Sequence, residues 1–189
     1  KAKLGDNAPP VLFYSGKMTL MKNKGVAIVG SRDIDDEAFD FTKKIAYHCT
    51  DDGLNIVSGG ARGVDSVAER VAMEKDGTTV VIMANNMDRK IKDIDTRKAI
   101  MKGQTLILSA QRPDMPFLAY TAMERNKYIY AAADYSIVVS SNYNKGGTWA
   151  GAVENLEKKW TPLFVRKGND VPEGNVKLLD KSNVFPITK

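Results

Sequence analysis

The sequence is poor in the residues that build disulfides and metal sites. It contains one cysteine, Cys49, and one histidine, His48. A single cysteine excludes an internal disulfide and a cysteine zinc cluster, and a single histidine excludes a multi-histidine metal site. No apolar run reaches the ~18 residues that a membrane-spanning helix needs. With no secretory signal at its start, the chain is expected to be cytoplasmic, with no membrane partner.

The bulk composition is that of a globular domain. The chain has 189 residues, 43% of them hydrophobic and 27% charged, which fits one domain. Lysine and arginine exceed aspartate and glutamate, giving a formal net charge of +5. This excess permits nucleic acid as a partner without requiring it. Nothing in the composition predicts a metal or another cofactor.

Short apolar strands alternate with amphipathic helices along most of the chain. Continuous apolar strands between helices are typical of a parallel sheet covered on both faces. We therefore predict an α/β fold: a single-domain, doubly wound, mostly parallel, Rossmann-like sheet. The predicted strands are Val26–Gly30, Asn55–Ser58, Thr79–Met83, Thr105–Ser109, Ser136–Ser140 and Leu163–Val165. The predicted helices are Asp36–Asp52, Asp65–Lys75, Ile94–Met101, Phe117–Ala132 and Thr148–Lys159, with a polar loop at Asn85–Arg89.

Two flanking segments are expected outside this core domain, which spans residues 25–165. Residues 1–24 are predicted to form an N-terminal extension with an edge strand at Val11–Tyr14. Residues 166–189 are polar and contain Gly and Pro, so we predict a surface tail with one short apolar piece, Val176–Leu179.

Two glycine-rich turns between a strand and a helix suggest a polyanion site. Ser58-Gly59-Gly60-Ala61-Arg62-Gly63-Val64-Asp65 follows one strand, and Gly146-Gly147-Thr148-Trp149 follows another, preceded by Arg125-Asn126-Lys127. Glycine lets backbone N–H groups approach a phosphate, and a helix N-terminus adds partial positive charge. Both turns, with Gly30-Ser31-Arg32, fall at the carboxyl edge of the predicted sheet, where such folds bind ligands.

The common nucleotide fingerprints are absent. The sequence has no G-x-x-x-x-G-K-[ST], which disfavours a Walker-type NTPase. Gly30-Ser31-Arg32-Asp33 is not G-x-G-x-x-G, and the second strand ends in Ser58-Gly59 rather than in an acidic residue for a ribose, which disfavours a dinucleotide dehydrogenase.

Taken together, the blocks resemble the DNA-processing protein A (DprA/Smf) family, part of a Rossmann-like superfamily that includes the LOG phosphoribohydrolases. Val26–Arg32 is similar to the first strand and VGSR turn of that family. Ser58–Asp65 resembles its S-G-x-A-R-G-[IV]-D block, and Arg125–Lys127 with Lys145–Thr148 resembles its RN[RK] and S-G-[ST] blocks. The resemblance covers roughly residues 10 to 165 in the same order.

The resemblance implies binding of single-stranded DNA, transfer of that strand to the recombinase RecA, formation of a homodimer, and no catalysis. It implies phosphate contacts by Arg32, Arg62, Arg125 and Lys127, and close approach of the strand to the main chain at the glycines. The whole expected site comprises Gly30, Ser31, Arg32, Ser58, Gly59, Gly60, Arg62, Gly63, Asp65, Arg125, Asn126, Lys127, Gly146, Gly147 and Thr148.

Some residues have simpler structural interpretations. Asp65 is read as a helix cap or loop brace, and Asn126 as a bridge between backbone groups. Where the family usually has histidine this chain has Glu69, which Ser66-Val67-Ala68-Glu69 explains as a capping box. Trp149 and Trp160 are expected in the core or an interface rather than stacked on bases.

Two alternatives to DNA binding stay open. The same cleft could hold one nucleotide in a non-catalytic sensor domain, which predicts a closed pocket. Less favoured is a LOG-like hydrolase of a nucleoside monophosphate, because glutamate is expected three residues after Thr148, where this chain has Gly151. Hydrolysis through an oxocarbenium ion needs a carboxylate beside the sugar.

Overall fold

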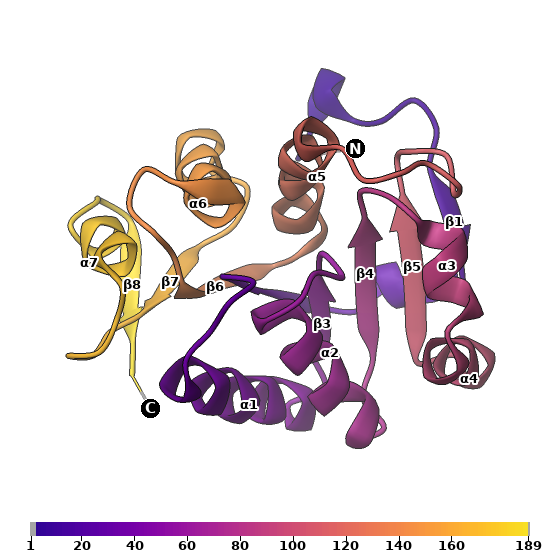
Figure 1. Ribbon diagram of the computed structural model, residues 1–189, viewed down its shortest axis with the longest axis horizontal. Helices are drawn as coiled ribbons and strands as arrows, with labels where there is room; N and C mark the ends of the chain where they lie inside the picture. Colours follow the sequence, from indigo (N-terminus) through magenta and orange to yellow (C-terminus); the bar gives the residue numbers. More distant parts are fainter. Residues whose placement is uncertain (1–2, 189) are drawn as a thin grey trace.

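One eight-stranded sheet runs through the computed structural model, which describes residues 3–188 (Figure 1). The strands are β1 (Phe13–Ser15), β2 (Gly25–Gly30), β3 (Asn55–Ser58), β4 (Thr79–Met83), β5 (Thr105–Ser109), β6 (Tyr135–Ser140), β7 (Leu163–Arg166) and β8 (Val184–Ile187). Their order across the sheet is β1-β5-β4-β3-β2-β6-β7-β8. Among the strands of the described residues, only the edge strand β1 pairs antiparallel, with β5. The predicted doubly wound, mostly parallel α/β fold is confirmed.

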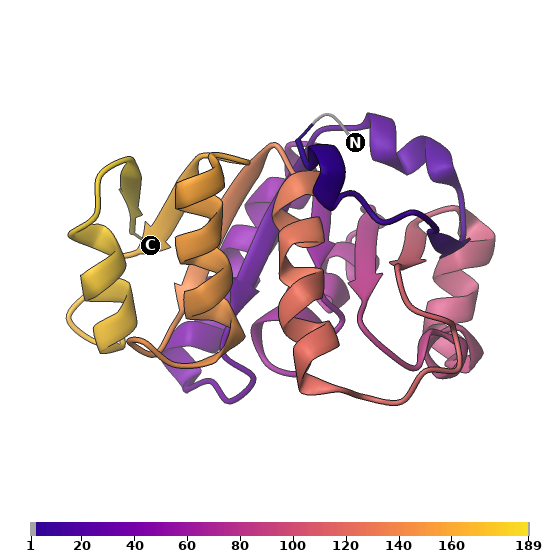
Figure 2. The ribbon, with the colours of Figure 1, turned by 90° about the horizontal axis from the view of Figure 1, so that it is seen from above.

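Helices cover both faces of the sheet. They are α1 (Asp36–Asp51), α2 (Val64–Glu74), α3 (Met87–Lys92), α4 (Ile94–Lys102), α5 (Ala119–Ala132), α6 (Gly146–Lys158) and α7 (Glu173–Leu179), with short 3-10 turns at Gly5–Asn7 and Met18–Lys22. Alternate residues of a strand point to opposite faces. Ala27 and Val29 therefore pack in the core with α5 and α6, whereas Val26 and Ile28 pack with α1 and α2. Figure 2 shows α5, α6 and α7 together on one face.

The order of the strands reverses between β2 and β6. From β2 the chain builds outward through β3, β4 and β5, then crosses back to place β6 on the other side of β2. The loops after β2 and β6 therefore diverge and leave a crevice at the carboxyl ends of these strands, which is where open α/β sheets bind ligands.

The C-terminal segment differs from the prediction. Residues 166–189 were expected to be a surface tail, but α7 and β8 extend the sheet, and β8 pairs parallel to β7. Leu178 and Asn175 of α7 are fully buried. The segment reads as polar because its helix buries a single large apolar side chain.

Two smaller differences concern the region after β4 and the chain start. The polar segment expected as a loop at Asn85–Arg89 enters α3, whose Met87 is buried. The edge strand expected at Val11–Tyr14 is β1, which begins at Phe13. Within residues 3–188, no helix is long and apolar enough to cross a membrane.

Candidate functional site

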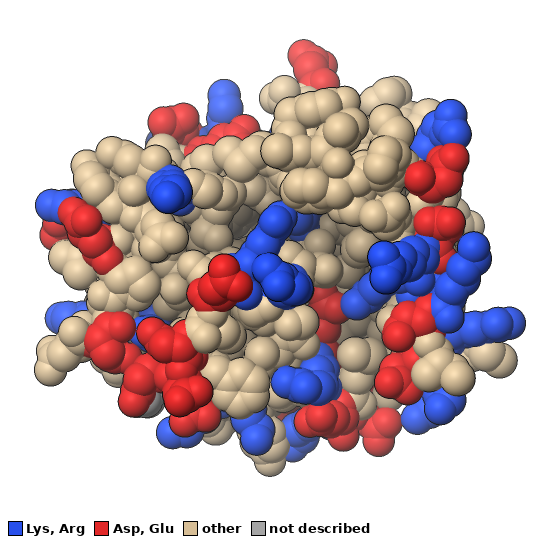
Figure 3. Space-filling model, viewed as in Figure 1, with Lys and Arg blue, Asp and Glu red and all other residues tan. Residues whose placement is uncertain are grey.

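A pocket of about 610 Å³ lies in the crevice at the strand-order reversal. Its walls come from the loops after β2 and β6, from α5 and from the first turn of α6. The residues that line it and were expected in the site are Gly30, Ser31, Arg32, Asp65, Arg125, Asn126, Gly146, Gly147 and Thr148. Blue side chains flank a hollow near the centre of this face in Figure 3, while acidic side chains gather over α1.

The N-terminus of α6 forms one wall of the pocket. Lys145 is the N-cap residue of α6, and its side chain makes no capping hydrogen bond in the described part of the chain. The first backbone N–H groups of α6 are therefore available to a ligand. Gly146 has φ +82°, a left-handed conformation that glycine adopts without strain, and open space surrounds it. A helix start of this kind attracts anions.

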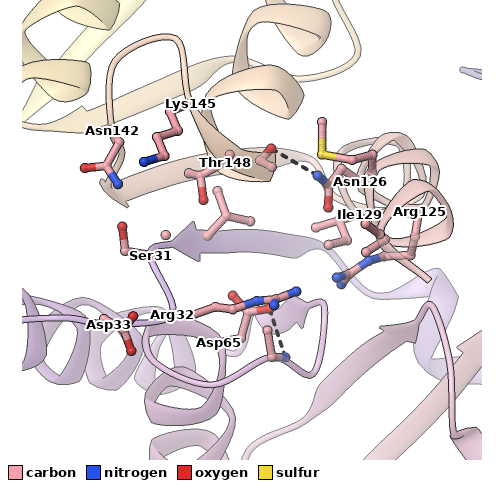
Figure 4. Close-up of a pocket in the computed structure, with 18 of the residues that line it drawn as sticks. Ser31, Arg32, Asp33, Asp65, Arg125, Asn126, Ile129, Asn142, Lys145 and Thr148 are labelled. Carbon is pink, nitrogen blue, oxygen red and sulfur yellow. Dashed lines mark hydrogen bonds between the residues drawn. The ribbon is translucent and has the colours of Figure 1, made fainter. Parts of the chain in front are cut away.

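Positive side chains reach the pocket from three elements. Arg32 lies in the loop after β2, Lys145 precedes α6, and Arg125 comes from α5; Figure 4 shows their charged ends in the same space. The acidic residues Asp33 and Asp65 are also among the residues that line the pocket. Three cations against two carboxylates leave an excess of one positive charge, before the helix terminus is counted.

The Arg125 side chain is buried rather than exposed to solvent. Only 8% of this residue is exposed, and its Nη1 donates a hydrogen bond to the Ile82 carbonyl at 3.1 Å. Burial lowers the pKa of Arg125, an effect that the charge of Asp65 opposes and that of Arg32 reinforces. The guanidinium thus forms part of the pocket floor and is fixed by the protein itself.

Asp65 braces the turn that follows β3. Its Oδ2 accepts hydrogen bonds from the backbone N–H of Gly59 at 2.9 Å and from that of Ala61 at 3.4 Å. Burial raises the pKa of this carboxyl to about 6, although the nearby charge of Arg125 acts in the opposite direction. These bonds bear out the interpretation of Asp65 as a loop brace.

The glycines of this turn allow close contacts within the protein. A Cβ on Gly59 would lie 1.4 Å from Nη1 of Arg125, so the guanidinium occupies the place of a side chain. Gly63, with φ +75°, brings the turn within contact of the Ser31 carbonyl. The turn therefore supports the pocket without lining it at four expected positions: Ser58, Gly59, Gly60 and Gly63.

Two of the expected basic contacts do not reach the pocket. Arg62 points outward with 81% of its side chain exposed, 3.8 Å from Asp33. Lys127 pairs with Glu124 at 3.3 Å and lies near the ring of Tyr128. Successive helical residues rotate by about 100°. Lys127 comes two positions after Arg125, a rotation of about 200°, and therefore faces away from it.

Asn126 and Glu69 both form internal bonds. Nδ2 of Asn126 donates to the Gly147 carbonyl at 3.0 Å, which ties α5 to the first turn of α6 through one backbone group. The capping-box interpretation of Glu69 is wrong. This buried carboxylate accepts from Ser58 Oγ at 2.6 Å and from Lys90 Nζ at 3.0 Å, while α2 already begins at Val64.

Sequence reasoning missed several pocket residues. Lys145 was part of a recognised block but was not assigned a contact, and Asn142 carries no motif. Phe117 and Met123 also line the pocket. They lie near the start of α5, in the stretch Phe117–Ala132 that was predicted only to be a helix. The pair Trp149 and Trp160 belongs to the core packing, as expected.

Comparisons with known proteins identify relatives of the whole fold. The DprA crystal structure from Streptococcus pneumoniae superposes with a TM-score of 0.85 at 25% identity, covering 99% of this chain and 67% of that one. A Helicobacter pylori structure, described by its single-stranded DNA binding mode, gives a TM-score of 0.80 at 28% identity, covering 95% of this chain and 82% of that one. The molybdenum cofactor carrier protein of Chlamydomonas reinhardtii, at 17% identity and a TM-score of 0.59, shares the fold alone.

Curated sequences point the same way. The DNA processing protein DprA of Streptococcus pneumoniae is 29% identical over 141 residues, and that of Bacillus subtilis is 28% identical over 156 residues. These alignments cover 74% and 79% of this chain but 50% and 51% of the relatives, so the chain spans about half their length. The model of the DNA recombination-mediator protein A family matches residues 1–181, and the chain belongs to that family.

Proposed function

We propose that this domain binds single-stranded DNA through the phosphate backbone and takes part in DNA processing without catalysing a reaction. The observation that carries the proposal is the convergence of Arg32, Lys145 and the uncapped start of α6 on one pocket at the strand-order reversal. Guanidinium groups bind phosphate in a bidentate manner, and basic clefts gain affinity by releasing counterions from DNA. The Helicobacter pylori relative, described as binding single-stranded DNA, supports this assignment.

The charged walls of the pocket suit a protein that binds DNA without recognising the base sequence. Backbone contacts and stacking tolerate any base, so we expect little dependence on sequence. Transfer of the strand to RecA and assembly as a homodimer, both implied by the family resemblance, remain proposals that DNA binding alone does not test. The same holds for the pathway, whether transformation, recombination or defence.

The size of the pocket favours a second candidate, a nucleotide-sensing domain. About 610 Å³ lies within the range of pockets that hold one small ligand. A hydrolase is less well supported. Asp65 already accepts two backbone N–H bonds, and Glu154 of α6 is not among the residues that line the pocket.

Competition separates these candidates. A fluorescently labelled dT oligonucleotide is titrated with the protein, and unlabelled dTMP or AMP is then added. DNA binding predicts that the oligonucleotide binds and that millimolar mononucleotide is needed to displace it. A sensor predicts tight mononucleotide binding with weak or no oligonucleotide binding. Release of free base from AMP would instead establish hydrolysis and overturn the non-catalytic assignment.

A further inference from the structure

An exposed apolar patch borders the pocket on the α5 side. Phe117, Tyr120 and Met123 are 48%, 64% and 44% exposed. A spacing of three residues places side chains on one side of a helix, and Tyr120 and Met123 follow this spacing within α5. Phe117 lies just before the helix. We call these three residues the α5 shelf.

The shelf is continuous with the basic pocket. Phe117 and Met123 themselves line it, and the Arg32 guanidinium lies 5.2 Å from the centre of the Phe117 ring. Lys145 and the start of α6 border the pocket from the neighbouring helix on the same face of the sheet (Figure 2), whereas Arg32 lies beside the shelf. One wall thus suits phosphates and the other suits flat apolar groups.

Internal packing does not account for these side chains. Isolated apolar side chains on a surface are ordinary, but here three neighbouring residues remain substantially open beside a charged pocket. A single strand of nucleic acid carries anionic phosphates along one side and flat, weakly polar bases along the other. Aromatic side chains beside a basic groove are the usual stacking surface for such bases.

We propose that the α5 shelf stacks nucleobases of the strand whose phosphates occupy the pocket, with Phe117 and Tyr120 as the stacking residues. This inference depends on the proposed DNA binding and adds a base-dependent, salt-independent contribution to it. Arg32 joins the two walls, because it can reach a phosphate while it stays beside the Phe117 ring.

The test compares two strands of equal length and charge. One is labelled oligo-dT, and the other carries abasic residues in place of thymidine. Phe117→Ala and Tyr120→Ala should each weaken oligo-dT binding by roughly 5- to 100-fold, while abasic binding changes less than twofold. Phe117→Tyr should restore oligo-dT affinity. Tyr135→Ala, at the opposite end of β6 with 40% exposure, is the matched control and should change neither affinity.

The outcomes distinguish a failure of base stacking from a failure of the proposed DNA binding. If Phe117→Ala weakens both strands equally, the residue acts through Arg32 or through folding, and stacking is wrong. If the unaltered protein binds both strands equally, stacking is likewise wrong while DNA binding stands. If it binds neither strand at low salt, DNA binding itself fails and the shelf loses its proposed occupant.

Discussion

At the scale of single residues, the floor of the pocket consists of charged side chains that contact groups of the protein itself. Asp65 accepts the N–H groups of Gly59 and Ala61, and Arg125 lies where a side chain on Gly59 would be. Buried charges of this kind need partners, because desolvation otherwise disfavours their ionised forms. The floor therefore fixes the shape of the pocket, and the residues free to meet a ligand are those at its walls.

Gly59→Ala tests whether this floor is closely packed. Its Cβ would meet the Arg125 guanidinium, so we expect a loss of roughly 2–3 kcal/mol in the free energy of unfolding, as overpacked cores show. The measurement is urea denaturation. Gly53→Ala serves as the control: its φ is +74° but nothing lies within 4 Å, so only about 1 kcal/mol of backbone strain is expected. Equal losses in the two variants would contradict the packing account.

The raised pKa of Asp65 predicts a pH dependence of stability. The folded value of about 6 lies above the ordinary 3.8, so the folded chain binds more protons between these values than the unfolded chain does. The free energy of unfolding contributed by Asp65 therefore falls as pH rises from about 4 to about 6. Relative to Asp65→Asn, the unaltered protein should lose about 2 kcal/mol between pH 4.5 and 7. A difference between the two proteins that does not change with pH would show that Asp65 titrates normally.

The same residues show which features of the pocket could not be predicted from the sequence. A glycine-rich turn shows that something approaches the backbone closely, but it cannot tell a ligand from the protein's own side chains. Here Arg125 approaches Gly59, and the chain's own carboxylate takes the N–H groups. Lys127 was expected to contact phosphate together with Arg125 because the resemblance of the Arg125–Lys127 block implies it, whereas helical rotation separates the two side chains. Gly30, Arg32 and Gly146–Thr148 were placed correctly at the pocket because strand ends determine their position.

At the scale of elements, α7 and β8 support the loop that follows β6. Asn175 of α7 is fully buried; its Oδ1 accepts from the Ser141 N–H at 2.8 Å, and its Nδ2 donates to the carbonyls of Val139 and Arg166. Gly174 lies against the Ser141 backbone. The C-terminal segment thus fixes the start of the loop that carries Asn142 and Lys145 to the pocket.

Asn175→Ala should be among the costly single substitutions. It leaves three buried backbone groups without these partners, for which we expect a loss of roughly 3 kcal/mol in the free energy of unfolding. Lys177→Ala, on the exposed side of the same helix, should cost under about 0.5 kcal/mol. Chemical denaturation of the two variants compares them directly. Similar, small losses would mean that the segment is the loosely held tail that its composition indicates.

The core strands and the longer helices could be predicted because their apolar residues repeat with a clear period. Such a period needs several turns to be visible, and α3 and α7 are too short to show one. α7 in addition relies on a buried asparagine, which reads as a surface residue. The α5 shelf was missed for the opposite reason, since exposed apolar residues in a helix resemble core residues in the sequence.

At the scale of the whole molecule, the net charge of +5 is spread over a surface that also carries many carboxylates. Net charge alone therefore does not identify a nucleic-acid surface. The assignment depends on where the fold places a few cations: Arg32, Lys145 and the start of α6 meet at one crevice, whereas Arg62 and Lys127 do not line it.

The salt dependence of oligo-dT binding tests this account most directly. Fluorescence anisotropy measures the affinity across a salt series for the unaltered protein, Arg32→Ala, Lys145→Ala and the exposed control Arg97→Ala on α4. Each phosphate neutralised on a single strand contributes about −0.7 to the log–log slope. We predict a slope of several phosphates that becomes shallower by about 0.7 in each pocket variant and is unchanged in Arg97→Ala. No binding at low salt, or an equal change in all three variants, would contradict the account.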